Sequence, residues 1–188
     1  MYAVAIELLT VAPMRIRNLT WLEAERHLVH TRLGPSPAIH LVIPGEETKN
    51  GAPFEVALPE RSAKLVAEYL RNYRPRLTPV ASPWLFPGYG GKQRNIDRFS
   101  ALISEFVLHE TGVRMHVHLF RHLAVNLHLD ANPEDVETAR RILGHKSLRT
   151  TLRAYADMKT AAAFRRYEET VVKLRERPST GRRRKKAA

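Results

Sequence analysis

The 188-residue sequence contains no cysteine. This absence excludes disulfides, thiolate zinc sites and a cysteine nucleophile, so any chemistry must come from hydroxyl, imidazole, carboxylate, amine or guanidinium groups. No apolar run approaches the roughly 20 residues needed to span a bilayer. The apolar stretch at residues 1–12 is short, contains Glu7 and has no basic leader, unlike a signal peptide. These absences favour a protein of the cell interior that folds without cross-links.

Acidic residues are also scarce, because 19 Asp and Glu stand against 31 Lys and Arg, for a net charge of +12. Such an excess indicates a polyanionic partner, and nucleic acid is the first candidate. A membrane surface would require a basic amphipathic helix, and no stretch fits that description well. The sequence GYGGK at 88–92 lacks the spacing of a nucleotide-binding loop, and no carboxylate cluster suits two-metal catalysis. We therefore expect no cofactor and no metal.

The charge is distributed over the whole chain. Residues 178–188 (PSTGRRRKKAA) hold five positive charges, and removing these five from +12 still leaves +7 on the rest. We expect one folded domain over 1–177, followed by a flexible basic tail that adds nonspecific affinity for DNA. Binding should then weaken steeply with salt, because both parts contact phosphates.

The periodicity predicts a mainly helical α+β fold with a small antiparallel sheet. Two strands are expected at 38–44 and 54–59, joined by a polar stretch whose Asn50-Gly51 pair favours a tight turn next to Lys49. A first helix should cover 2–11, and a second should begin near Asn18 with Leu19, Leu22 and Leu28 on related faces. Further helices are expected at about 61–73, 96–109, 118–129, 133–143, 148–157 and 161–176.

Two local signals refine this picture. For the helix at 133–143, Asn132 is expected to be the cap and Pro133 the first residue, and Gly144 should end it. The apolar connector WLFP at 84–87 is expected to serve packing rather than base stacking.

Three polar groups near the C-terminal end could act on an anion. His118 and Arg121 are three residues apart, hence on one face of one helix, whereas His122 is expected to point elsewhere and to be packed or hydrogen-bonded. His145 follows the helix-ending Gly144, where a side chain can project from a fixed backbone. Taken singly, the pair is frequent in basic proteins, and an ordinary exposed histidine is the better reading of His145.

The combination is more specific than its parts. HxxR at 118–121, LGH at 143–145, and Tyr155 one short helix further on resemble the carboxy-terminal signature of the tyrosine recombinases, the phage-integrase family. Upstream, Pro13-Met14-Arg15-Ile16-Arg17-Asn18-Leu19 is similar to the family segment that carries another arginine, with Arg15 in its place. Lys49, in a turn before a strand ending in Leu58-Pro59, is similar to the family lysine. The resemblance runs from about residue 3 to about residue 160.

The sequence departs from the family pattern in three ways. Asn18 stands where the family usually has Glu, which bears on how the arginine is oriented. Tyr155 lies ten residues after His145 where nine is commonest, and Ala154 occupies the ninth position. Such enzymes grip the other face of DNA with an amino-terminal domain, and we expect this chain to be the catalytic domain without it.

The resemblance implies site-specific DNA recombination through a 3′-phosphotyrosyl intermediate on Tyr155, without ATP or metal. It implies that Arg15 and Arg121 stabilise the phosphate oxygens and that His118 is the general acid or base. His145 would donate a hydrogen bond to the phosphate or assist the tyrosine, and Lys49 would protonate the departing 5′ oxygen. We expect all six to converge on one basic concavity, although Tyr155 can shift with its helix before assembly.

Double-stranded DNA is then the expected partner, with self-association on DNA, as a tetramer to which residues 161–176 contribute apolar surface. The expected location is the bacterial cytoplasm, at the nucleoid when DNA is bound. Two alternatives stay open at this point. One is a truncated or catalytically weakened DNA-binding relative of the same fold. The other is a metal-independent nuclease that uses His118 and His145 as acid and base.

Overall fold

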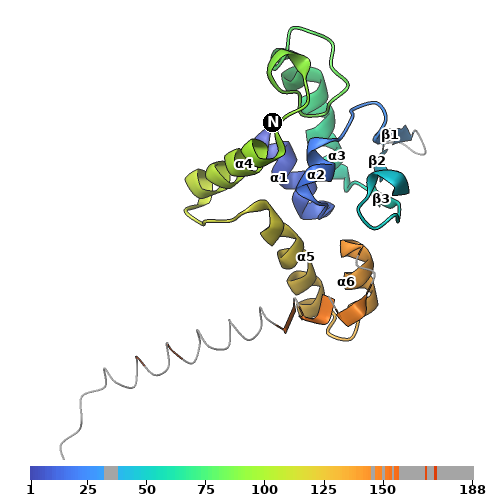
Figure 1. Cartoon of the computed structure of the whole chain (residues 1–188), viewed down its shortest axis with the longest axis vertical. Coiled ribbons are helices and arrows are strands. Elements are labelled where there is room, and N and C mark those ends of the chain that lie inside the picture. The colour runs from blue at the N-terminus through green and yellow to red at the C-terminus, as the bar shows by residue number, and fades with distance from the viewer. Residues whose placement is uncertain are drawn as a thin grey trace, which may run out of the picture.

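The computed structural model describes residues 1–31, 38–144, 147–149, 151–153, 155–156, 168 and 172. Within them the chain is mainly helical with a small antiparallel sheet, as the sequence predicts (Figure 1). None of the helices in these ranges combines the length and the apolar composition needed to cross a membrane. The helices are α1 (Tyr2–Val11), α2 (Ile16–Thr20), α3 (Glu60–Glu68), α4 (Ile96–Thr111), α5 (Val117–Ala131) and α6 (Val136–Leu143), and the strands are β1 (Leu28–Thr31), β2 (Ala38–Ile43) and β3 (Phe54–Ala57).

The sheet has the order β1-β2-β3, with both pairs antiparallel. In β2, Ile39, Leu41 and Ile43 are buried and alternate with less buried residues, which is the pattern of a strand with one face on a core. Leu41 lies opposite Leu28 of β1 and Val56 of β3. The two strands expected from the sequence are therefore confirmed, each ending one or two residues earlier than predicted.

The third strand corrects the sequence reading of Leu28. The helix expected from about Asn18 ends at Thr20, and Leu28 begins β1. The backbone N–H of Val42 in β2 donates to the carbonyl of His27 at 2.9 Å, which extends this pairing beyond the strand. Pairing with β2 satisfies backbone groups that a helix would have satisfied internally, so tertiary context decides between the two.

Helix α1 lies at the centre of the main core. Val4, Ala5, Leu8 and Leu9 are at most 2% exposed, and the helix packs against α3, α4 and α5. A helix that is apolar over most of its surface is stable only when it is covered on several sides. This burial fixes the segment that follows α1, which carries Arg15.

Helices α5 and α6 form a second, smaller core, and α6 lies beside the connection between β2 and β3 (Figure 1). The buried members of this core are Val125, Leu129, Ala139 and Leu143. This arrangement corrects the predicted start of α6: Asn132 ends α5, because its backbone N–H donates to the carbonyl of His128 at 2.8 Å.

The helix α6 itself begins after Asp135, whose Oδ1 accepts from the Thr138 N–H at 3.1 Å. Pro133 thus precedes the helix, in the connection from α5. The expected end at Gly144 is confirmed, since this residue has a left-handed φ of 56° that favours glycine.

The connector WLFP packs into the protein, as expected. Leu85 and Phe86 are fully buried, and the Phe86 ring lies between those of Tyr69 and Phe99, with centroid distances of 5.8 and 5.5 Å. Tyr69 belongs to a π-helical turn at Tyr69–Tyr73 that continues α3, so the helix predicted at 61–73 changes type near its end. The Tyr69 hydroxyl donates to the carbonyl of Leu85 at 2.9 Å and thereby joins the end of α3 to the connector.

Four expectations concern residues outside this description. The helix predicted at 161–176 lies outside it except for Glu168 and Val172, which are helical, and the tail at 178–188 lies outside it entirely. Of the helix predicted at 148–157, residues 148–149, 151–153 and 155–156 are described and are helical. His145 also falls outside the described residues.

We predict that Tyr69→Phe lowers the free energy of unfolding by about 1–2 kcal/mol, because the buried carbonyl of Leu85 loses its donor. Urea denaturation followed by circular dichroism measures the change. Tyr73→Phe is the matched control, since Tyr73 is 51% exposed. Equal stability of the two variants would show that the buried hydrogen bond contributes nothing.

Candidate active site

Two arginines from distant parts of the chain meet between the sheet and the helices. Arg15 precedes the first residue of α2, and Arg121 lies on α5 with only 5% of its surface exposed. The Arg121 guanidinium donates to the carbonyl of Pro13 at 2.5 Å and to the carbonyl of Leu143 at 2.6 Å. Arg121 therefore joins three segments: α5, the connection that carries Arg15, and the end of α6.

The two guanidinium groups are close enough to repel each other. Burial, and then the charge of Arg15, lower the pKa of Arg121 to about 10, so the side chain stays protonated at neutral pH. Within the described ranges, neither arginine forms an ion pair with a carboxylate. A buried cation beside a second cation is stabilised by an anion, and a phosphate can accept hydrogen bonds from both.

Two adjoining cavities open at this arginine pair. Both are lined by Met14, Arg15, Asn18, Thr48 and Arg121. The larger, about 710 Å³, is also lined by Lys49, His116 and His118. The smaller, about 310 Å³, reaches Asn50, Arg140, Arg141 and Gly144. The structure thus brings Arg15, Lys49, His118 and Arg121 to one cavity, as the sequence predicts for these four positions.

Lys49 lies at the tip of the connection between β2 and β3, and its side chain is exposed. The predicted turn is present, with Gly51 at a left-handed φ of 74°. Two amide side chains hold this connection: Asn18 Nδ2 donates to the carbonyl of Glu47 at 3.1 Å, and Asn50 Nδ2 donates to the carbonyl of Gly144 at 2.6 Å. Asn18, which replaces the usual glutamate of the resemblance, therefore contacts the lysine-bearing connection.

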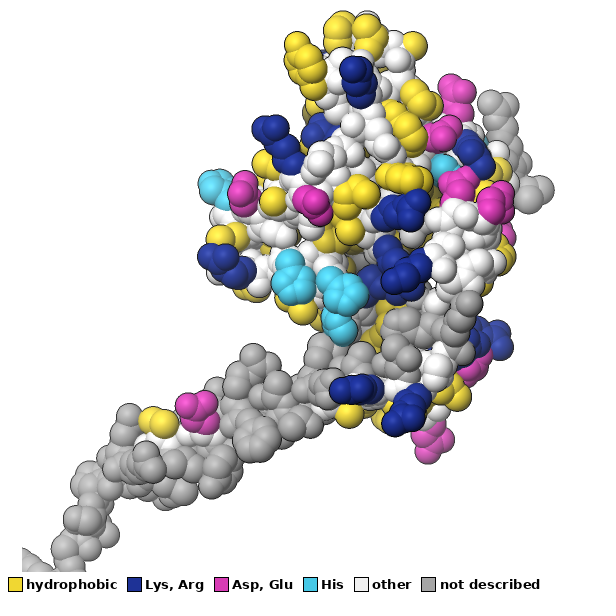
Figure 2. Space-filling view, viewed as in Figure 1, with side chains coloured by type: hydrophobic (Ala, Val, Ile, Leu, Met, Phe, Trp, Pro, Cys, Tyr) yellow, Lys and Arg dark blue, Asp and Glu magenta, His cyan; other side chains and the backbone are white. Residues whose placement is uncertain are grey.

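The expectation that His122 is packed is confirmed, because its ring lies edge-on to that of His118 with a centroid distance of 4.7 Å. His122 itself is not among the residues that line either cavity. The spacing of four residues on a helix gives the physical reason for the ring contact and was the signal available in the sequence. Burial, and then the charges of His122 and Arg121, lower the pKa of His118. In the space-filling view, histidine side chains gather beside Lys and Arg side chains on one face (Figure 2).

Tyr155 does not join these residues, contrary to the expected convergence of all six. Its hydroxyl donates to Asp130 Oδ1 at 3.3 Å, and its ring packs against the second core. Asp130 lies about nine residues beyond Arg121 on α5, or roughly 13 Å along the helix axis. The apolar surface of α5 and α6 holds the ring there, and local sequence could not predict this tertiary contact.

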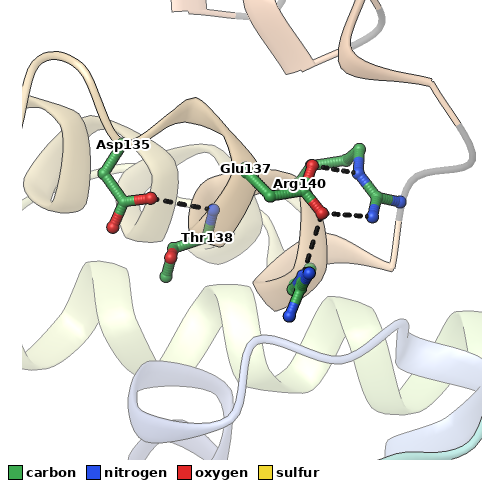
Figure 3. A network of polar contacts seen from close by, with 5 residues as sticks. Asp135, Glu137, Thr138 and Arg140 are labelled. Carbon is green, nitrogen blue, oxygen red and sulfur yellow. Dashed lines mark hydrogen bonds and ion pairs between the residues drawn. The ribbon is translucent and has the colours of Figure 1, made fainter.

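Glu137 organises two further arginines, which the sequence reading missed. Its carboxylate accepts from Arg140 at 2.6 and 2.8 Å and from Arg141 at 2.9 Å (Figure 3). These hydrogen bonds lower the pKa of Glu137 to about 2. The spacings of three and four residues on α6 were the sequence signal for these pairs. Since Arg140 and Arg141 both line the smaller cavity, Glu137 offsets positive charge at its edge.

Comparison with known proteins bears on this arrangement. The family model described as "Phage integrase family" matches residues 1–161. A search of curated proteins found no significant match.

Among solved structures, the chain is similar to the XerH site-specific recombinase bound to palindromic difH substrate in a post-cleavage complex. The TM-score is 0.63 at 21% identity, covering 93% of this chain and 46% of that one. It is also similar to the XerA recombinase, with a TM-score of 0.57 at 18% identity, covering 86% of this chain and 57% of that one. For a lambda integrase (75-356) dimer bound to a COC′ core site, the TM-score is 0.51 at 15% identity, covering 82% of this chain and 51% of that one.

The chain therefore spans about half the length of these proteins and shares the fold of their catalytic domains. Because the family model covers most of the sequence, and because the fold agrees with it, this chain belongs to the phage integrase family.

Proposed function

We propose that this chain is the catalytic domain of a tyrosine-type site-specific DNA recombinase. The observation that carries the proposal is the pair of arginines, without carboxylate partners in the described residues, at a cavity that Lys49 and His118 also line. A site of this composition suits a phosphodiester, in which negative charge develops on the nonbridging oxygens during attack. The resemblance of the motifs and the membership of the family support the same reading.

The proposed step is a transesterification. The Tyr155 oxygen forms a bond to the scissile phosphorus, and the bond between phosphorus and the 5′ oxygen breaks. The tyrosine proton passes to His118, and the Lys49 ammonium gives a proton to the 5′ oxygen, which leaves as a hydroxyl. The 3′-phosphotyrosyl ester retains the energy of the broken bond, so the reverse sequence rejoins the strand.

The electrostatics of His118 favour this role. A base must be neutral before it accepts a proton, and a lowered pKa keeps the imidazole neutral at physiological pH. The arginines supply charge that stabilises the five-coordinate phosphorus of the transition state. Arg15 is the better placed of the two to reorient, because its side chain is only partly buried. His145, outside the described residues, keeps its expected role as a second donor to the phosphate.

The position of Tyr155 requires a rearrangement before cleavage. The tyrosine must leave Asp130 and approach the arginine pair, which separates the resting arrangement from the reactive one. We propose that DNA binding and contact with a second protomer drive this movement, through residues 161–176. On paired sites, four protomers would supply the four nucleophiles that strand exchange needs.

The tyrosine position also favours the second candidate function, a DNA-binding relative of the same fold that no longer cleaves. In that case Tyr155 would be a structural residue, held by Asp130 and the second core. The proposed DNA contacts would be the same, and only the covalent step would be missing.

We predict that a nicked suicide DNA substrate of the cognate site yields a covalent adduct with the wild-type chain and none with Tyr155→Phe. The short fragment that carries the freed 5′ hydroxyl diffuses away after cleavage. The phosphotyrosyl ester therefore accumulates and is seen on a denaturing gel. Tyr89→Phe is the matched control, because Tyr89 is fully exposed and lies outside the cavity. Cleavage that persists in Tyr155→Phe would indicate the nuclease reading, and binding without any adduct would indicate the inactive relative.

We predict that His122→Gln raises the pKa of His118, since it removes a neighbouring charge and part of the burial. Proton-detected NMR titration of the imidazoles measures the shift. His109→Gln is the control, because His109 is exposed at the end of α4. An unchanged His118 titration in His122→Gln would contradict the proposed coupling.

The same shift fixes the sign of a stability effect. The folded-state pKa of His118 lies below the unfolded value near 6.5, so protonation favours the unfolded chain. The contribution of the neutral imidazole to stability is complete above about pH 6.5 and is lost as the pH falls through the folded-state pKa.

We predict that Glu137→Gln tightens binding to random duplex DNA and steepens its salt dependence, because Arg140 and Arg141 become available to phosphates. Each added phosphate contact changes the slope of log K against log salt by about 0.9. Fluorescence anisotropy over a range of NaCl concentrations measures this. Glu110→Gln removes the same charge at the far end of α4, and identical slopes for the two variants would contradict the prediction.

A further inference from the structure

The side chain of Asn50 connects the lysine-bearing turn to the end of α6. Its Nδ2 donates to the carbonyl of Gly144 at 2.6 Å, a contact between residues 94 positions apart in the chain. Asn50 is the immediate neighbour of Lys49, and the backbone N–H of Gly51 donates to the carbonyl of Thr48 at 3.3 Å, which closes the turn around both residues. Lys49 and Asn50 are therefore the two central residues of one hydrogen-bonded turn.

The end of α6 is shaped to receive this amide. A Cβ on residue 144 would lie 3.0 Å from Asn50 Nδ2, and the φ of 56° at Gly144 is itself unfavourable for other residues. The preceding carbonyl, that of Leu143, accepts from Arg121 at 2.6 Å. Two successive carbonyls at the end of α6 thus accept hydrogen bonds from the site. The carbonyl of Gly144 holds the lysine turn through Asn50, and that of Leu143 holds Arg121.

We infer that Asn50 is a positioning residue that holds Lys49 in place for proton transfer to the leaving 5′ oxygen, by docking the turn on Gly144. This inference rests on the proposed function. The side chain of Lys49 is exposed, so its location depends on the turn rather than on contacts of its own. The segment leading to His145 and Tyr155 begins at Gly144, so docking also ties the acid to the part of the chain that carries the nucleophile.

A substrate with sulfur in place of the bridging 5′ oxygen separates positioning of the acid from a general structural role. A thiolate leaves without a proton, since thiols have a pKa near 8.5 and alcohols are far weaker acids. Asn50→Ala should therefore slow cleavage of the oxygen substrate by about tenfold or more while leaving cleavage of the sulfur substrate within about threefold of wild type. Lys49→Ala, which removes the acid itself, should show the same pattern. Its loss of rate on the oxygen substrate is the largest that Asn50→Ala should cause.

Asn132→Ala is the matched control, because Asn132 Nδ2 also donates to a carbonyl at a helix end, that of His128 at 3.2 Å, away from the lysine turn. It should cleave both substrates at the wild-type rate. An equal loss of rate on both substrates in Asn50→Ala would overturn the inference, as would a wild-type rate on the oxygen substrate.

Hydrogen exchange of the Gly51 amide gives a readout that does not depend on cleavage. Loss of the docking contact should make local opening easier, and so speed this exchange by about tenfold in Asn50→Ala and leave it unchanged in Asn132→Ala. If the wild-type chain cleaves neither substrate, the proposed function fails, and the exchange result alone decides whether Asn50 holds the turn. Unchanged exchange in Asn50→Ala would overturn the inference whatever the cleavage results.

Discussion

The buried guanidinium of Arg121 joins the parts of the chain that form the site. Burying a cation costs several kcal/mol, and hydrogen bonds from a charged donor recover about 1.5–3 kcal/mol each. Arg121 makes two such bonds, to carbonyls of Pro13 and Leu143, which lie 108 and 22 residues away in sequence. These bonds place Arg15 and the end of α6 beside α5. They leave the positive charge itself uncompensated by a carboxylate in the described residues, so the same interaction that holds the fold together prepares it for an anion.

The rest of the site follows from this constraint. Once the end of α6 is fixed by Arg121, the carbonyl of Gly144 is available to Asn50, and the turn carrying Lys49 docks there. Asn18 holds the other side of that turn through the carbonyl of Glu47. Arg15 and Arg121 line both cavities. Lys49 adds its charge to the larger one, and Arg140 and Arg141, which pair with Glu137, line the smaller one. Tyr155 is held apart, so the proposed nucleophile and the proposed phosphate site are assembled separately.

Much of this arrangement could be predicted from local patterns. The spacing of His118 and Arg121 predicted a shared face, and alternation in 38–44 and 54–59 predicted the strands that present Lys49. Contacts that depend on the tertiary path were missed. The helical period of Leu19, Leu22 and Leu28 predicts a helix that reaches Leu28, and only pairing with β2 shows that Leu28 begins strand β1. Asn132 and Pro133 together predict a helix that begins at Pro133, because asparagine is a good cap. In the structure Asn132 ends α5 instead, and Asp135 caps α6. The contact between Tyr155 and Asp130 depends on how the chain leaves Gly144, which no local signal specifies.

In the proposed mechanism, Arg15 and Arg121 hold a phosphate whose nonbridging oxygens carry the developing charge. Arg15 tests this claim most directly, because Arg121 also supports the fold. Rates of cleavage by wild type and Arg15→Ala would be compared on a normal phosphodiester and on a methylphosphonate, in which a methyl group replaces one charged oxygen. If Arg15 acts on that charge, Arg15→Ala should cleave the phosphodiester roughly 10²–10³-fold more slowly than wild type. The same variant should lose far less rate on the methylphosphonate. An equal loss on both substrates would contradict the claim.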